Sequence, residues 1–103
     1  MDGWSIGRFD AVEWSPWGSS GNARAKVLAN GDGYFLALVE AEPGYAGDAH
    51  EHAHTEFLYV VDGSLVSQGE LLGRGDGYVA SVGSIHSQFE APDGATYLSI
   101  FKL

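Results

Sequence analysis

The four histidines of the chain are unevenly distributed, because His50, His52 and His54 lie within five residues and His86 stands apart. Side chains on a β-strand alternate between its two faces. An extended segment here would therefore present four possible ligands on one side: His50, His52, His54 and Glu56. Imidazole nitrogen and carboxylate oxygen suit Fe, Mn, Ni, Co, Cu or Zn, and the absence of Cys excludes thiolate zinc sites. The cluster predicts a site for a divalent transition metal, the alternative being a solvated polar loop.

The same histidines match H-E-x-x-H, the signature of zinc proteases, over residues 50–54. Protease chemistry requires a helix, which places the two histidines on one face and directs the glutamate toward the reacting water. Pro43, Gly44 and Gly47 lie just upstream, and the β-type run Phe57–Val61 follows. Because a helix has no room between them, we set the protease interpretation aside.

Two spaced patterns surround the histidines. The first, G-x5-H-x-H-x3-E-x6-G, is met at every position: Gly44, His50, His52, Glu56 and Gly63. The second, G-x5-P-x-G-x2-H-x3-N, keeps its spacing, with Ser in place of Pro and Glu in place of Asn: Gly75, Ser81, Gly83, His86 and Glu90. Through these two motifs the sequence resembles a single-domain cupin, and the resemblance covers about residues 34–102.

The resemblance implies a small jelly-roll β-barrel that carries a metal in its interior. It assigns His50, His52 and Glu56 as the ligands of the first motif. It assigns His86 as the ligand of the second. Three neutral imidazoles and one carboxylate would leave a divalent ion with one net positive charge and about two open coordination positions. We expect one divalent transition metal per chain, with Fe as the native ion and Mn, Ni, Zn, Co or Cu as alternatives.

Two further polar residues near the motifs are candidates for roles in the site. His54 has three competing roles: a hydrogen-bond partner that orients a ligand, a pocket acid or base, and an exposed histidine at the barrel mouth. We favour the first or the last, since a group flanked by ligands usually orients them. Glu90 is a candidate general base for the substrate. The alternative, which we favour, is a carboxylate at a strand end just before Pro92.

The rest of the sequence predicts short β-strands separated by tight turns. Many of the fifteen glycines follow Asp or Asn, as at Gly31 and Gly63, and supply the positive φ angles that such turns need. No window has the apolar period of a helix. We predict strands near Ala23–Ala29, Tyr34–Ala41, Glu56–Val61, Leu65–Ser67, Tyr78–Ala80, His86–Glu90 and Ala95–Lys102. The predicted fold class is all-β, a single-domain jelly-roll barrel over residues 1–103, with an N-terminal arm and first strands in 1–30 and the two-motif core in 34–102.

The N-terminal segment is rich in aromatic residues without a regular pattern: Trp4, Phe9, Trp14 and Trp17. It could pack its rings over one mouth of the barrel, or it could form a dimer contact, since aromatic residues favour interface cores. Residues 34–41 and 95–102 are apolar at almost every position, which indicates burial on both faces. In a domain this small such burial favours a homodimer.

Composition limits the partners. Five Lys and Arg against fourteen Asp and Glu give the 103 residues a net charge of −9, which argues against nucleic acids and anionic membranes as partners. No apolar run is long enough to cross a bilayer, and the N-terminal sequence lacks the apolar core of a secretion signal. We therefore expect a cytoplasmic protein whose partner is a small-molecule substrate or ligand.

Fold alone does not fix the reaction, because cupins include oxygenases, isomerases, lyases and binding modules. We predict a non-haem metal oxygenase that acts on a small organic molecule inside the barrel. One alternative is a non-catalytic binding or sensing module, because residues 50–103 also resemble the cupin domain attached to some anti-sigma factors. The other is a redox-neutral isomerase or lyase, in which the metal acts only as a Lewis acid.

Overall fold

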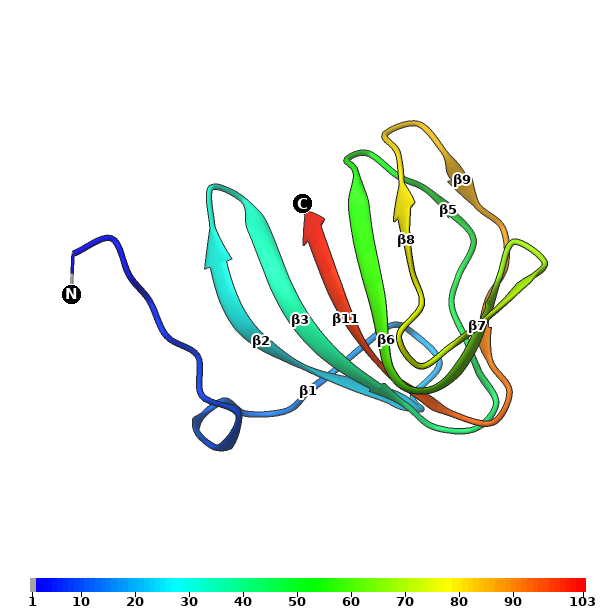
Figure 1. Cartoon of the computed structure of the whole chain (residues 1–103), viewed down its shortest axis with the longest axis horizontal. Coiled ribbons are helices and arrows are strands. Elements are labelled where there is room, and N and C mark those ends of the chain that lie inside the picture. Colours follow the sequence, from blue (N-terminus) through cyan, green and yellow to red (C-terminus); the bar gives the residue numbers. More distant parts are fainter. Residues whose placement is uncertain (1) are drawn as a thin grey trace.

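A strongly curved antiparallel sheet makes up most of the molecule (Figure 1). The computed structural model describes residues 2–103. Its strands are β1 (Ser15–Pro16), β2 (Ala23–Gly31), β3 (Tyr34–Ala41), β4 (Tyr45–Ala46), β5 (His50–Glu51), β6 (Glu56–Ser67), β7 (Glu70–Gly73), β8 (Gly77–Ala80), β9 (Ile85–His86), β10 (Phe89–Ala91) and β11 (Ala95–Lys102). Nine strands join in one sheet, in the order β1-β2-β3-β11-β6-β10-β4, with β7 and β8 both paired to β6. Strands β5 and β9 form a separate two-stranded ladder.

The all-β prediction is confirmed. Within residues 2–103 the one helical element is a 3-10 turn, η1 (Phe9–Ala11). None of the helices found there is long and apolar enough to cross a membrane. The sheet curls into a half-barrel, and its concave side encloses the core.

Strand β6 holds the two halves of the curled sheet together, and its length differs from the prediction. The sequence suggested separate strands on either side of Gly63, but the structure has one twelve-residue strand. Its first half pairs with β8 and β11, and its second half pairs with β7 and β10. Gly63 has a φ of 75°, so the strand can turn there without ending.

Two predicted extended segments are instead interrupted. Strand β5 ends at Glu51 and β6 begins at Glu56, so the histidine-rich segment is not one continuous strand. The predicted strand His86–Glu90 is divided into β9 and β10. The break occurs because the backbone N–H groups of Ser87 and Gln88 donate to the side-chain carbonyl of Gln68, at 2.7 and 2.9 Å, instead of joining a ladder.

Side chains of the long strands point alternately to the interior and to the outer face of the sheet. On β11, Ala95, Tyr97 and Ser99 are buried, whereas Ile100 is exposed. The sequence did not indicate which face turns inward, because both faces of β3 and β11 are apolar. The buried apolar core comprises Ala25, Ala37, Val39, Ala41, Tyr45, Leu58, Val60, Leu65, Phe89, Ala91, Ala95 and Tyr97.

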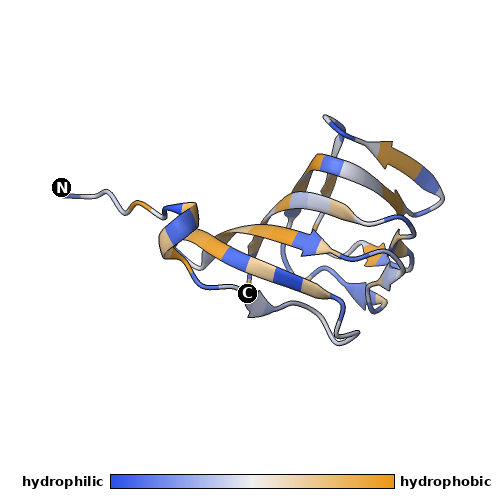
Figure 2. Ribbon diagram, turned by 90° about the horizontal axis from the view of Figure 1, so that it is seen from below, coloured by the Kyte–Doolittle hydropathy of each residue, from blue (hydrophilic) through white to orange (hydrophobic). Residues whose placement is uncertain are grey.

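The N-terminal segment divides into two parts. Trp17 packs edge-to-face on Phe101, with ring centroids 5.6 Å apart, and so covers the opening of the half-barrel. Residues 2–6 instead project away from the sheet (Figures 1 and 2), and Trp4 and Ile6 are exposed. The expectation of aromatic rings packed over the mouth is therefore met by Trp17 and not by Trp4.

The turn of β6 at Gly63 yields a stability prediction with a matched control. Gly63 and Gly69 both have positive φ, 75° and 79°. A Cβ on Gly63 would lie 2.4 Å from the carbonyl oxygen of Gly94, whereas a Cβ on Gly69 would meet nothing within 4 Å. We expect Gly69→Ala to lower the free energy of unfolding by about 1 kcal/mol, the cost of left-handed backbone for an L-residue. Gly63→Ala should lower it by about 3 kcal/mol, because backbone must also shift. If urea unfolding gave the same decrease in the free energy of unfolding for both variants, this explanation would be contradicted.

Candidate metal centre

Two short strands bring the two halves of the site together. Strands β5 and β9 pair antiparallel, with His50 opposite His86. His52 follows β5 and is held by backbone bonds: its N–H donates to the carbonyl of Ser84 at 2.9 Å, and its carbonyl accepts from Gly83 at 2.8 Å. Residues more than thirty positions apart therefore meet because a ladder and a turn fix their backbones.

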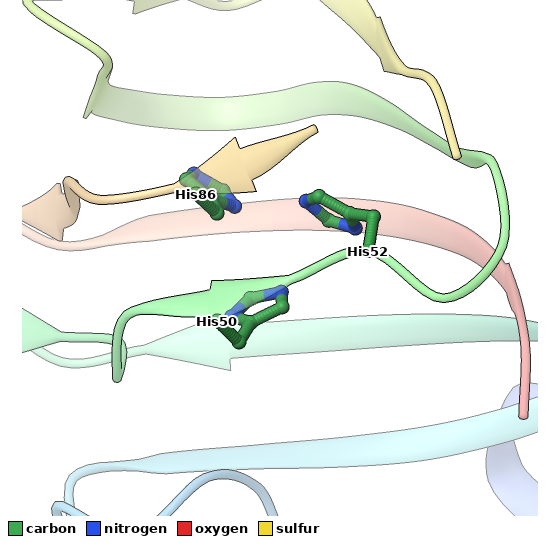
Figure 3. Close-up of side chains that lie close together, drawn as sticks. All are labelled: His50, His52 and His86. Atoms are coloured by element: carbon green, nitrogen blue, oxygen red, sulfur yellow. The ribbon is translucent and has the colours of Figure 1, made fainter. Parts of the chain in front are cut away.

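The three imidazole rings face a common centre (Figure 3). The ring centroids of His50 and His52 are 4.7 Å apart, and each lies 5.4 Å from the centroid of His86. One nitrogen from each ring can be chosen so that all three lie within 4.8 Å of one another. Such a spacing allows one ion to contact all three rings.

A protein group lies beside one nitrogen of each ring. His50 Nδ1 lies 2.9 Å from the carbonyl oxygen of Asp48, an acceptor only, so Nδ1 carries the proton and Nε2 keeps its lone pair. His86 Nε2 lies 3.0 Å from the hydroxyl oxygen of Ser67. His52 Nδ1 lies 3.9 Å from Oε1 of Glu56. Groups of this kind fix ring orientation around metal sites in general.

Burial leaves polar atoms of these rings without partners. His52 and His86 are 7% and 6% exposed. Among residues 2–103, three buried side-chain atoms have no hydrogen-bond partner, and two are ring nitrogens: His52 Nε2 and His86 Nδ1. Leaving a buried polar atom unpaired costs about 1–3 kcal/mol. A bound ion would offset part of this cost, so the donor set fits a divalent transition metal.

Electrostatics favour the form of histidine that binds a metal. Burial lowers the pKa of His86, and the neighbouring His50 and His52 lower it further. His86 is therefore neutral at neutral pH, and a neutral imidazole is the metal-binding form. Three imidazole nitrogen donors without Cys suit Fe, Mn, Co, Ni, Cu or Zn.

Glu56, predicted as the fourth ligand, lies beside the three histidines and outside their tight group. Its Oε2 accepts a hydrogen bond of 2.8 Å from the hydroxyl of the fully buried Ser99. Its Oε1 faces His52. Ligation by Glu56 thus stays a prediction, with Ser99 as the group that holds its carboxylate.

The structure separates the other two candidates from the histidine group. His54 is exposed and lines the cavity mouth, because the chain leaves the extended conformation between Glu51 and Glu56. The expectation that one extended segment presents His50, His52, His54 and Glu56 on the same side is therefore wrong, whereas an exposed position at the mouth is one of the roles predicted for His54. Glu90 follows the buried Phe89 on β10, so the side chains of the two residues point to opposite faces of the strand. Glu90 is not part of the cavity wall.

A cavity of about 420 Å³ opens beside the histidines. Its wall is mainly aromatic and apolar: Trp17, Tyr45, Leu58, Tyr78, Phe89, Tyr97 and Phe101. Burial raises the pKa values of Tyr78 and Tyr97, so both hydroxyls stay protonated at neutral pH. The Tyr78 hydroxyl is the third buried atom without a partner among residues 2–103. A larger hollow of about 630 Å³ near Glu40 and Asp62 holds no histidine, so size alone does not locate the site.

Sequence reasoning missed three residues of this environment: Ser67, Tyr78 and Ser99. Ser99 carried a signal, since it is a polar residue within an apolar strand. Ser67 and Tyr78 carried none, because their positions opposite the histidines depend on how the sheet curls.

Comparison with known proteins gives one family and one fold. The sequence model of the ChrR cupin-like domain matches residues 4–102. No curated protein matched the sequence. The resemblance to cupins is confirmed by this match, which spans nearly the whole chain.

Solved structures with the same fold differ in what they do. An RmlC-like cupin from Shewanella frigidimarina superposes with a TM-score of 0.83 at 21% identity, over 94% of this chain and 88% of that one. An acetylacetone dioxygenase from Acinetobacter johnsonii gives 0.78 at 12% identity, over 99% and 74%. The Rhodobacter sphaeroides anti-sigma factor ChrR, in complex with SigE, gives 0.77 at 23% identity, over 92% of this chain and 52% of that one. At these identities the likeness establishes the cupin fold alone.

Two neighbouring histidines provide a matched test of the metal site. We expect His52→Ala to lose most of the bound metal, because it removes one of three converging donors. His54→Ala should retain it, because His54 is exposed and outside the group. Metal content per chain of each purified variant measures the difference, and circular dichroism checks the fold. Metal retained in His52→Ala, or lost equally in both variants, would contradict the assignment.

A second variant tests the position of Glu90. We expect Glu90→Gln to leave both metal content and any turnover unchanged, because the carboxyl group lies outside the cavity wall. A fall in turnover at constant metal content would instead make Glu90 an acid or base of the reaction.

Proposed function

The chain belongs to the ChrR cupin-like domain family, and within that family we propose that it is a metal-dependent oxygenase that acts on a small, largely apolar organic molecule. One observation carries the proposal: the three histidines border a cavity of about 420 Å³ whose wall is mainly aromatic and apolar. A site that only held an ion would not need such a cavity. Pockets of a few hundred Å³ with few polar groups are typical of small-molecule sites.

The metal would be held by His50, His52 and His86, with Glu56 as the fourth ligand. Bound there, a divalent ion supplies Lewis acidity and, where the ion is Fe, redox chemistry with dioxygen. Three neutral imidazoles and one carboxylate leave one net positive charge. This charge favours a substrate with a monoanionic head, such as an enolate or a hydroxy acid.

The protein's own side chains would bind and orient the rest of the substrate. The rings of Trp17, Phe89 and Phe101 offer apolar contact to its body and exclude water from the reacting head. The buried, unpartnered hydroxyl of Tyr78 is a donor within the same wall. Held this way, the head and the metal would stay close during the reaction.

A non-catalytic binding or sensing module is the second candidate. It is favoured by the family match, because the family takes its name from ChrR, which one of the superposed structures places in complex with SigE. A redox-neutral isomerase or lyase is a third candidate, and it would accept Zn or Ni and need no oxygen. Oxygen consumption separates the oxygenase from the other two.

Oxygen uptake is therefore the test of the proposal. We expect protein purified without added metal, then loaded with Fe(II), to consume oxygen with at least one member of a diketone and hydroxy-acid panel. Fe(II)-treated His52→Ala should consume none above the rate of free iron, because it lacks one of the donors that hold the metal. Metal binding without uptake on the panel would move the assignment to sensing or to redox-neutral chemistry. Protein that binds no metal would contradict all three candidate functions.

A further inference from the structure

A second cavity, of about 510 Å³, lies against two of the three histidines. We call it the lateral cavity, and we call the cavity of about 420 Å³ described above the main cavity. His52, Tyr78 and His86 line both cavities, whereas His50 lines the main cavity alone. We call the three shared side chains the partition. The histidine group is therefore approached by two hollows from different directions.

The lateral cavity lies where the curled sheet is not closed. Among residues 2–103, strand β8 pairs only with β6, and β9 pairs only with β5. The two strands run side by side and are joined by the turn at residues 81–84, without a ladder between them (Figure 1). No backbone hydrogen bonds therefore hold them at the ladder spacing of about 4.8 Å. This seam leaves room for an opening through the side of the half-barrel.

The walls of the lateral cavity suit a small, uncharged molecule. Apolar side chains from β7, β8 and β9 line it: Leu72, Val79, Ala80 and Ile85. None of the described residues that line it is a lysine or an arginine, and the exposed carboxylate of Glu70 stands beside it. Electrostatic repulsion therefore disfavours an anion.

The partition is a single layer of side chains, because each of its three members borders both cavities. The three buried side-chain atoms that lack a hydrogen-bond partner among residues 2–103 all belong to it: His52 Nε2, Tyr78 Oη and His86 Nδ1. Packing alone thus holds the ring of Tyr78, which lies edge-on to His86 with 6.0 Å between the ring centroids. Tyr78 is therefore the member of the partition that can move without breaking a hydrogen bond.

We propose that dioxygen reaches the metal centre through the lateral cavity, past Tyr78, while the organic substrate enters through the main cavity. This inference rests on the proposed function. A substrate held by its head at the histidines, with its body between Trp17 and Phe101, would stand between the mouth and the metal. The second reactant then needs another way in. Dioxygen is small, uncharged and apolar, so it gains by leaving water for the apolar walls of the lateral cavity.

Nitric oxide is an uncharged diatomic that binds Fe(II), and its association measures the route without turnover. Fe(II)-loaded protein is first saturated with 4-phenylimidazole, a neutral ligand that takes one coordination position and carries an aromatic body for the main cavity. Calorimetry checks that 4-phenylimidazole binds. Stopped-flow mixing with nitric oxide in the absence of oxygen then gives the association rate constant.

Two variants fill the opening of the lateral cavity. We expect Ser81→Trp to lower the association rate constant about tenfold, because the new ring stands at an exposed position of the cavity wall and must move aside before the ligand enters. Ile85→Trp fills the same opening from β9, at a 66% exposed position, and serves if Ser81→Trp does not fold. It should slow association in the same way.

Val82→Trp is the matched control. Val82 adjoins Ser81, is 65% exposed and lines neither cavity, so its association rate constant should equal that of the wild-type protein. A wild-type rate in the folded blocking variants would overturn the proposal, as would an equal fall in Val82→Trp. If 4-phenylimidazole prevented nitric oxide from binding to the wild-type protein, the proposal would also be overturned, because both ligands would then use one entrance.

Oxygen uptake on the diketone and hydroxy-acid panel, measured on the same wild-type preparation, separates this proposal from the proposed function. Slow nitric oxide association in the blocking variants, together with no oxygen uptake by the wild-type protein, would support the lateral route and contradict the oxygenase. Oxygen uptake with a wild-type nitric oxide rate in the blocking variants would do the opposite. Wild-type protein that does not bind Fe(II) would overturn both.

Discussion

Two imidazole rings lie almost fully buried inside an apolar half-barrel, and the arrangement of the site follows from that burial. His52 and His86 each keep a buried ring nitrogen that no protein atom satisfies. Such atoms cost about 1–3 kcal/mol each when they leave water unpaired. The surrounding structure must hold them there against this cost. Backbone bonds from Ser84 and Gly83 fix His52, and the β5–β9 ladder fixes His86 opposite His50.

The sheet supplies the rigidity that those contacts need. Strand β6 passes from one half of the curled sheet to the other and carries Glu56 at its start and Ser67 at its end. Each of these residues contacts a histidine, Glu56 from 3.9 Å and Ser67 from 3.0 Å. One continuous strand therefore fixes both sides of the site relative to each other. Its turn at Gly63 is what allows a single strand to reach both.

The sequence predicted much of this arrangement because the motifs are local. The resemblance to the two cupin motifs singled out His50, His52 and His86, and the turn glycines predicted a succession of short strands that the structure confirms in outline. The interruption at residues 52–55 was not predictable, because it depends on backbone bonds from His52 to a turn thirty residues later. The same is true of the break after His86, which Gln68 causes from the turn between β6 and β7. Contacts between distant segments were thus the missing information.

The sequence also did not show which face of two long strands is buried. Strands β3 and β11 are apolar on both faces, and nothing in their sequence distinguishes the interior from the outside. The structure turns Tyr97 and Ser99 inward, toward the cavity and Glu56, and leaves Ile100 outside. One face of these strands therefore lines the interior beside the site, and the other lies on the outside of the sheet.

X-ray absorption at the zinc edge of protein loaded with one zinc ion tests the central claim most directly, because it counts the ligands around the metal. The convergence of His50, His52 and His86 predicts nitrogen and oxygen ligands at about 2.0–2.1 Å, with the multiple scattering of three imidazole rings. A spectrum with one imidazole or none would contradict the claim. The three rings would then converge for a reason other than metal binding.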